Sequence, residues 1–149
     1  MAHRFPDISA YGSALRFALE AEQACADLAA AAGVLAPDQA WRDKLEEVVC
    51  THDDRVQKLN VLPIVAGPAA HEPVRSLEGS AYLGTLDAEP VTTWPGAVEQ
   101  LIQAEEDAAR YHDAFAAECR AVLGDRAKAF AKSAQQDRDY AAALRKLLG

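Results

Sequence analysis

The sequence has few cysteines and no long apolar run, and each shortage excludes a class of protein. The three cysteines, Cys25, Cys50 and Cys119, are widely spaced and form no Cys-x-x-Cys pair. Zinc ribbons and rubredoxin-type iron sites within one chain need such pairs. A membrane-spanning helix needs roughly 20 apolar residues in succession, and the sequence has no such run. We therefore expect neither a cysteine-only metal site nor a membrane protein.

The odd number of dispersed cysteines is typical of a protein whose thiols stay reduced. Cys25 and Cys119 fall on apolar faces at helical spacing, which predicts that both are small core residues. Cys50 points to a different face, and we expect it to be exposed. The N-terminal segment has no apolar stretch of signal-peptide length. These features together predict a cytoplasmic protein.

Basic residues are also scarce. The chain has 15 Lys and Arg against 23 Asp and Glu, which gives a formal net charge of −8. Such a chain offers no basic patch that could displace counterions from phosphate, so we expect no nucleic-acid partner. A membrane surface is disfavoured as well, because no segment carries a basic amphipathic face.

Alanine and aliphatic residues, in contrast, are abundant. Half of the 149 residues are hydrophobic but only 7% are aromatic, and alanine occurs in runs such as residues 29–32. Alanine has the highest helix propensity of all residues, so this composition favours closely packed helices over sheet. The chain is long enough to bury a substantial core. We predict one all-α domain over residues 1–149.

Four segments carry apolar residues at helical spacing between recognisable start and stop signals. They are residues 7–33 (or 9–33), 38–60, 93–123 and 125–148. Asp7 or Ser9 would cap the first segment and Asp38 the second, while Gly33 would end the first. Short connections join the first segment to the second and the third to the fourth, so each pair is predicted to form an antiparallel hairpin.

Residues 61–95 interrupt the helical pattern with several prolines and glycines. A loop of this length is unusual in a compact domain unless it runs the length of a helical bundle. We interpret it as a crossover between two helices that point the same way, with a short helix over residues 74–83. The predicted fold is an antiparallel four-helix bundle made of two hairpins joined by this crossover.

Each predicted helix carries one ionisable residue in the middle of its apolar face. These residues are Glu22, His52, Glu105 and Asp137. A charged group on a buried face costs free energy unless it is paired, hydrogen-bonded or bound to a metal. One such residue per helix predicts a polar centre inside the bundle. His112 lies on the same face as Glu105, one heptad or roughly 10 Å further along the helix.

A weak internal repeat relates the two hairpins. Residues 19–23 superpose on residues 102–106, which places Glu22 opposite Glu105. Residues 56–59 match residues 144–147 in the same way. This second match places His52 opposite Tyr140, and Val49 opposite Asp137. The two hairpins therefore look like copies of one unit.

With these motifs the sequence resembles the ferritin-like superfamily, especially its rubrerythrin-like members. Residues 18–24, Ala-Leu-Glu-Ala-Glu-Gln-Ala, look like the first-helix motif of the family with Glu22 in the ligand position. Residues 103–106 look like the third-helix motif, with Glu105 as the ligand. The resemblance implies two hairpins around two irons, where one helix of each hairpin gives a Glu and the other gives Glu-x-x-His.

Both Glu-x-x-His motifs depart from the family pattern. The second helix reads Val49-x-x-His52, so the histidine remains and the glutamate is replaced by an apolar residue. The fourth helix reads Asp137-x-x-Tyr140, so a shorter carboxylate remains and the histidine is replaced by a phenol. The four ligands that remain are Glu22, His52, Glu105 and Asp137.

Three carboxylates and one imidazole can hold one metal ion but are few for two irons. We therefore predict a site for iron, zinc or manganese, with one ion easier to support than two. Tyr140 is expected to donate a hydrogen bond to a carboxylate, with phenolate ligation as the alternative. His112 would pair with Asp137, or stand where the family often has an aromatic residue. The resemblance also implies a homodimer and, with iron bound, oxidase- or peroxidase-like chemistry with an unidentified electron donor.

The alternative is a metal-free bundle that acts as a structural or partner-binding module. In this arrangement Glu22 and Glu105 would share His52 and His112 as protonated partners, and Tyr140 would complete the network. The two lost ligand positions favour this alternative. The sequence leaves open whether the protein is an enzyme.

Overall fold

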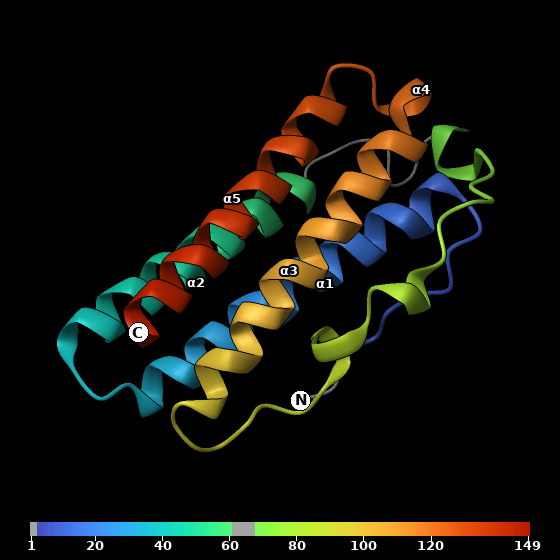
Figure 1. Ribbon diagram of the computed structural model, residues 1–149. Helices are drawn as coiled ribbons and strands as arrows, with labels where there is room; N and C mark the ends of the chain where they lie inside the picture. The colour runs from blue at the N-terminus through green and yellow to red at the C-terminus, as the bar shows by residue number, and fades with distance from the viewer. Residues whose placement is uncertain (1–2, 61–67) are drawn as a thin grey trace.

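The computed structural model describes residues 3–60 and 68–149, and within these ranges the chain is helical and has no β-strand. The all-α prediction is confirmed. Figure 1 shows the long helices lying side by side in a bundle-like arrangement, with a short helix at one end. The helices are α1 (Tyr11–Leu35), α2 (Gln39–Asn60), α3 (Gly96–Glu118), α4 (Arg120–Leu123) and α5 (Arg126–Leu148). None of the helices in the described ranges is both long enough and apolar enough to cross a membrane.

Helix α1 begins and ends later than its sequence signals suggest. The backbone N–H groups of Ser9 and Ala10 both donate to the Ser13 hydroxyl, at 3.0 and 3.1 Å, so a residue inside the helix caps its start. Gly33 stays helical, and the chain leaves the helix at Ala36 with φ −60° and ψ 136°. The residue before a proline is disfavoured in the α region, and Pro37 therefore ends α1 where Gly33 does not.

Helices α2 and α5 follow the prediction closely. The Trp41 N–H donates to the Asp38 carboxylate at 3.0 Å, so Asp38 is the cap of α2. The predicted third helix, however, is broken at Cys119, whose φ of −107° and ψ of 16° leave the helical region. The short helix α4 follows and ends at Gly124, where φ is +56°, a conformation that favours glycine. The break places Leu123 in the same apolar cluster as Cys119 and Phe130.

The crossover between α2 and α3 is described from residue 68 onwards, and residues 61–67 lie outside the described ranges. It contains the 3₁₀ turns η2 (Pro68–His71), η3 (Gly79–Ala81) and η4 (Gly84–Asp87). The short helix predicted over 74–83 is therefore wrong. At Gly79 a Cβ atom would lie 2.8 Å from the Phe17 ring, so the crossover lies close against α1 at this glycine.

The four long helices in the described ranges surround a common interior. Helix α1 packs against α2 and α3, and α3 packs against α5. Helices α5 and α2 are joined by polar side chains, since the Tyr140 and Thr51 hydroxyls lie 2.6 Å apart and Arg55 reaches Asp137. The seam between α2 and α5 is thus bridged by hydrogen bonds.

The interior contains two apolar clusters. One is rich in alanine and aliphatic residues and includes Leu45, Leu101 and Leu144. The other is aromatic and includes Phe17 and Tyr111. Along α1 and α5, Glu22 and Asp137 fall near the boundary between these clusters, whereas Glu105 on α3 is flanked by Ala104 and Ala108 of the aliphatic cluster.

The predicted environments of the three cysteines are confirmed. Cys25 and Cys119 are buried, and Cys50 is exposed. Cys25 belongs to the aliphatic cluster and Cys119 to the aromatic one. Packing is therefore sufficient to explain the burial of both thiols.

Candidate metal centre

The structure brings together the four residues predicted to form a polar centre. Glu22 from α1, His52 from α2, Glu105 from α3 and Asp137 from α5 are each at most 1% exposed. His52 lies in the middle of the group. Its Nε2 is 2.6 Å from Glu105 Oε1 and 4.0 Å from Asp137 Oδ1, while its Nδ1 is 3.4 Å from Glu22 Oε2.

Small neighbours on the same helix faces make room for these side chains. Alanine lies one turn away from the buried carboxylate on α1, α3 and α5, since positions three or four apart share a helix face. These buried alanines are Ala18, Ala26, Ala108, Ala134 and Ala141. The Ala-rich composition therefore leaves interior space for polar side chains and allows the helices to pack closely.

His112 of α3 also belongs to the centre, because it contacts Glu22 of α1. Its Nε2 lies 2.8 Å from Glu22 Oε1 and 3.7 Å from Asp137 Oδ2. The predicted pairing of His112 with Asp137 is thus present, but the shorter contact is to Glu22. The rings of Tyr111 and Phe130 pack at 6.2 and 6.0 Å from the imidazole, so this side of the centre has aromatic walls.

Tyr140 does not join the centre. Its hydroxyl shares a hydrogen bond of 2.6 Å with the Thr51 hydroxyl, and within the described ranges no hydrogen bond or ion pair links Tyr140 to the buried carboxylates. Three residues along a helix change the direction of a side chain by about 60°, which turns Tyr140 away from Asp137 and toward α2. The predicted hydrogen bond from Tyr140 to a carboxylate is therefore wrong.

Arg55 is the residue that the sequence analysis missed. Its Nη1 lies 2.6 Å from Asp137 Oδ1 and 3.3 Å from Glu22 Oε1. Its Nη2 donates to the Gln136 side chain at 2.6 Å and to the Ser133 carbonyl at 3.3 Å. The guanidinium therefore connects α2 with both α1 and α5.

The position of Arg55 explains why it was missed. It lies on the edge of the apolar face of α2, and such a residue usually belongs to the surface. A long arginine stem can nevertheless carry its charge into the interior. The available signal was the spacing of three residues from His52, which places both side chains on one face. We refer to Glu22, His52, Arg55, Glu105, His112 and Asp137 as the polar centre.

The buried charges shift one another's pKa values. Burial lowers the pKa of His52, but the charges of Glu105 and Glu22 outweigh it and hold that pKa well above its ordinary value. Burial also raises the pKa of Glu22, yet the charge of His52 and hydrogen bonds from His112 and His52 hold it well below its ordinary range. Burial and the charge of Glu105 raise the pKa of Asp137 to about 7, against the lowering effect of His52 and Arg55.

The polar centre is neutral when both imidazoles are protonated, because three carboxylates then face two imidazolium groups and one guanidinium. Its hydrogen bonds are nevertheless incomplete. Within the described ranges, five buried side-chain N or O atoms have no hydrogen-bond partner. Four of them belong to the centre: His52 Nδ1, Glu105 Oε2, His112 Nδ1 and Asp137 Oδ2. A buried polar group without a partner costs roughly 1–3 kcal/mol, so the protein groups alone do not satisfy this centre.

The donors form two groups that can each hold a metal ion. We call Glu22, His112 and Asp137 the carboxylate cluster, and Cys25, His52 and Glu105 the cysteine cluster. Within each cluster, one ligand atom from every residue lies within 4.8 Å of the other two. The carboxylate cluster offers oxygen and nitrogen, and the cysteine cluster adds sulfur.

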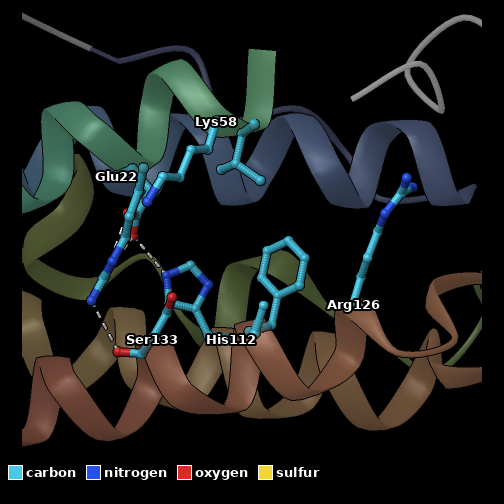
Figure 2. Close-up of a pocket in the computed structure, with 9 residues that line it drawn as sticks. Glu22, Lys58, His112, Arg126 and Ser133 are labelled. Carbon is cyan, nitrogen blue, oxygen red and sulfur yellow. Dashed lines mark hydrogen bonds and ion pairs between the residues drawn. The ribbon is translucent and has the colours of Figure 1, made fainter. Parts of the chain in front are cut away.

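A cavity of about 180 Å³ reaches the carboxylate cluster between α2 and α5. Figure 2 shows Glu22 and His112 toward one end and Arg126 toward the other. Arg55 and Phe130 also line it. The volume is sufficient for several water molecules or one small molecule. Glu22 and His112 are therefore the members of the carboxylate cluster that a small molecule in this cavity would meet.

Comparison with known proteins returned no matching family model, curated protein or solved structure. The resemblance to ferritin-like proteins therefore stays a prediction based on motifs. The single-domain organisation, the homodimer and the cytoplasmic location also stay predictions.

Proposed function

We propose that this protein is a ferritin-like, antiparallel four-helix bundle that binds one transition-metal ion through the carboxylate cluster, with His52 and Glu105 beside the ion. The observation that carries this proposal is the set of unpartnered buried atoms. Four of the five in the described ranges belong to the polar centre, and they come from three different helices. A bound cation gives the carboxylate oxygens a partner and offsets their charge.

The donor chemistry fits one ion of the predicted kind. Two carboxylates and one imidazole are ligands that iron, manganese and zinc all accept. The His112 Nε2 and Asp137 Oδ2 atoms are 3.7 Å apart, and Arg55 engages the other oxygen of Asp137. Arg55 thereby leaves Oδ2 available as a ligand. The resemblance itself implies iron, and the donor set accommodates iron, zinc or manganese.

A complete di-iron centre of the family type does not fit equally well. Val49 stands where the motif has a glutamate, and it is partly buried against the aliphatic cluster. In addition, the Arg55 guanidinium already supplies a positive charge between Glu22 and Asp137. A second cation at this position would be repelled by that charge. The residues present therefore favour a single ion at the carboxylate cluster.

A bound ion would supply Lewis-acid chemistry and, if it is iron, redox chemistry of the oxidase or peroxidase type that the resemblance implies. The chain's own residues would hold the ion, admit a small reactant and limit the access of water. Glu22 and His112 face the cavity, and Arg55 fixes the orientation of the Asp137 carboxylate. Phe130 adds an apolar wall to the cavity. The same site could also bind or store a metal ion without catalysing a reaction, which is the less specific version of this proposal.

Metal analysis tests the proposal directly. The protein is purified without chelator or nickel resin, and a second sample is made metal-free and titrated anaerobically with Fe²⁺, Mn²⁺ and Zn²⁺. We expect at least one of these ions to bind with a stoichiometry near one, and Asp137→Asn to weaken that binding. Asp139→Asn is the matched control, because Asp139 is an exposed carboxylate on the same helix. A protein that is isolated metal-free and takes up none of the three ions would contradict the proposal.

The second candidate is a metal-free ferritin-like module, and the position of Arg55 favours it. The Arg55 guanidinium pairs with two buried carboxylates and thereby offsets part of the negative charge that a metal ion would otherwise neutralise. The centre would then be structural. Exchanging Arg55 and Asp137 together for apolar residues of similar volume would leave stability and partner binding unchanged or improved. A loss of bound metal in this double variant would instead support the first proposal.

A further inference from the structure

The position of the Cys25 sulfur is not explained by core packing alone. It is fully buried on α1, and its thiol makes a weak hydrogen bond to the Ala104 carbonyl at 3.8 Å. Packing in the aliphatic cluster explains the burial of the side chain. It does not explain why the sulfur lies within 4.8 Å of ligand atoms of both His52 and Glu105.

The two neighbours of this thiol have unused binding capacity. Glu105 Oε2 has no hydrogen-bond partner in the described ranges, and His52 Nδ1 has only its 3.4 Å ion pair with Glu22 Oε2. Both His52 and Glu105 are 0% exposed. The remaining polar atoms, His52 Nε2 and Glu105 Oε1, contact each other at 2.6 Å. The His52 imidazole and the Glu105 carboxylate are thus held together beside the Cys25 sulfur. In this buried interior, each polar atom without a hydrogen-bond partner costs free energy.

We propose that the cysteine cluster is a second metal site, in which Cys25 Sγ, His52 and Glu105 bind a thiophilic divalent cation such as Zn²⁺. Sulfur, imidazole nitrogen and carboxylate oxygen are the three ligand types that zinc uses in proteins. Soft thiolate ligands select zinc over magnesium, calcium and manganese, which prefer oxygen donors. Three protein ligands also leave one coordination position open.

Binding at this site requires a proton to leave the Cys25 thiol and another to leave the His52 imidazolium. Burial and the charge of Glu105 hold the pKa of Cys25 well above its ordinary value in the absence of a metal. A divalent cation displaces the thiol proton to solvent and forms the metal–sulfur bond, with no change in oxidation state. His52 must also lose a proton, because its raised pKa makes it an imidazolium in the metal-free protein. The reaction therefore takes up one cation and releases two protons, one from the thiol and one from the imidazolium.

This inference rests on the proposed function only in that both place a metal ion in the polar centre. The ligands are different, so the two can fail separately. The carboxylate cluster contains no sulfur and borders the cavity, whereas none of the cysteine cluster residues lines that cavity. A measurement that detects metal–sulfur bonds reports on the cysteine cluster alone.

Cobalt(II) provides that measurement, because a thiolate bound to Co²⁺ gives an intense near-ultraviolet charge-transfer band that oxygen and nitrogen ligands do not give. The reduced, metal-free full chain is titrated with Co²⁺, and total bound Co²⁺ is measured by equilibrium dialysis. We expect the band to saturate at one thiolate-bound ion per chain. Zn²⁺ should abolish it by displacement.

Matched variants assign the band to one sulfur. Cys25→Ser should remove the band and weaken Zn²⁺ binding by more than about tenfold. Cys50→Ser removes an exposed thiol and Cys119→Ser a buried one, and both should keep the band. Asp137→Asn should also keep it, since that residue belongs to the carboxylate cluster.

The outcomes separate the two ideas. Bound Co²⁺ without the band in the unmodified chain overturns the role of Cys25 and leaves the carboxylate cluster standing. A band that disappears in Cys50→Ser also overturns it, because the sulfur would then be at the surface. No bound Co²⁺ at all overturns both proposals. If Cys25→Ser fails to fold, the unmodified chain together with Cys50→Ser and Cys119→Ser still decides the question, since a band that survives in both variants comes from Cys25.

Discussion

The carboxylate cluster and the cysteine cluster differ in access, charge and donor chemistry, although the imidazole of His52 connects them. The carboxylate cluster borders a cavity and is paired with Arg55, and its donors are oxygen and nitrogen. The cysteine cluster lies away from that cavity and adds a sulfur donor. His52 contacts Glu22 through Nδ1 and Glu105 through Nε2.

This difference shows how a bundle built from two similar hairpins can have an asymmetric interior. The repeat places Glu22 opposite Glu105, but only Glu22 contacts a guanidinium and only Glu105 lies in a cluster with a thiol. The asymmetry arises from Arg55 and Cys25, which stand outside the motifs. Changes on one side should therefore reach the other side chiefly through His52, and four predictions test this comparison.

The largest effect is expected from Glu22→Ala. This change leaves Arg55, His52 and His112 with an incomplete set of partners, so it should lower the free energy of unfolding by about 3–5 kcal/mol. Urea denaturation followed by circular dichroism would measure the loss. Glu20→Ala is the control on the same helix, since the Glu20 side chain is 25% exposed, and we expect less than about 1 kcal/mol there. Equal losses in the two variants would contradict the buried network.

Arg55→Met should have two opposite effects. The metal-free protein loses the partner of two buried carboxylates, and unfolding should become easier by about 2–4 kcal/mol, less than for a fully buried charge because Arg55 is 11% exposed. Metal affinity of the carboxylate cluster should rise, because a competing cation is gone. Arg138→Met removes a surface ion pair with Asp113 and should change neither quantity by more than about 1 kcal/mol. Lower metal affinity in Arg55→Met would show that the guanidinium supports the ion instead of competing with it.

The pH dependence of stability should change direction when metal is bound. In metal-free protein, the lowered pKa of Glu22 contributes stability that is present above about pH 4.5 and is lost as the pH falls below that value. The raised pKa values of His52 and Asp137 contribute stability that is lost as the pH rises, through about pH 7 for Asp137. Metal-free protein should therefore be most stable in mild acid.

With metal bound, protons compete with the ion for the same ligands, so stability should rise between pH 5 and about pH 7.5. Thermal unfolding of chelator-treated and metal-saturated samples across this range would measure both trends. Parallel pH curves for the two samples would contradict metal binding at the ionisable groups of the polar centre.

The smallest effect is expected from Tyr140→Phe. The change removes one hydrogen bond to Thr51 at the seam between α2 and α5, which is worth about 0.5–1.5 kcal/mol. Metal binding should not change, because Tyr140 lies outside both clusters. Calorimetric titration of the variant would check this, with Thr51→Val as the partner in a double-mutant cycle. A clear loss of metal affinity would place the phenol closer to the ion than the structure does.

The sequence was sufficient for the helices and for most of the centre because both depend on helical periodicity. An ionisable residue in the middle of an apolar face must turn inward with that face, and this placed Glu22, His52, Glu105 and Asp137 correctly. The same argument failed for Arg55, whose long side chain reaches the interior from the edge of a face. It failed for Tyr140 because the family motif, and not the periodicity, suggested its role.

The errors in the fold have a similar origin. Helical periodicity alone revealed neither the break at Cys119 nor the absence of an α-helix over residues 74–83. At Gly79 the crossover lies close against Phe17 of α1, a contact that no local pattern reveals. The Asp38 cap was confirmed, because the cap and the amide it binds lie within one turn. The local signals at Asp7, Ser9 and Gly33, in contrast, did not set the ends of α1.

Arg55 has a further consequence for any iron bound at the carboxylate cluster. A guanidinium stays charged at every pH a protein experiences, so its field at the cluster is permanent. A fixed positive charge nearby disfavours the more highly charged oxidation state and raises the reduction potential of the ion. Iron beside Arg55 would therefore be held preferentially as Fe²⁺, and Arg55→Met would lower its potential. With iron bound, the arginine that joins α2 to α5 would thus also set an electrochemical property of the centre.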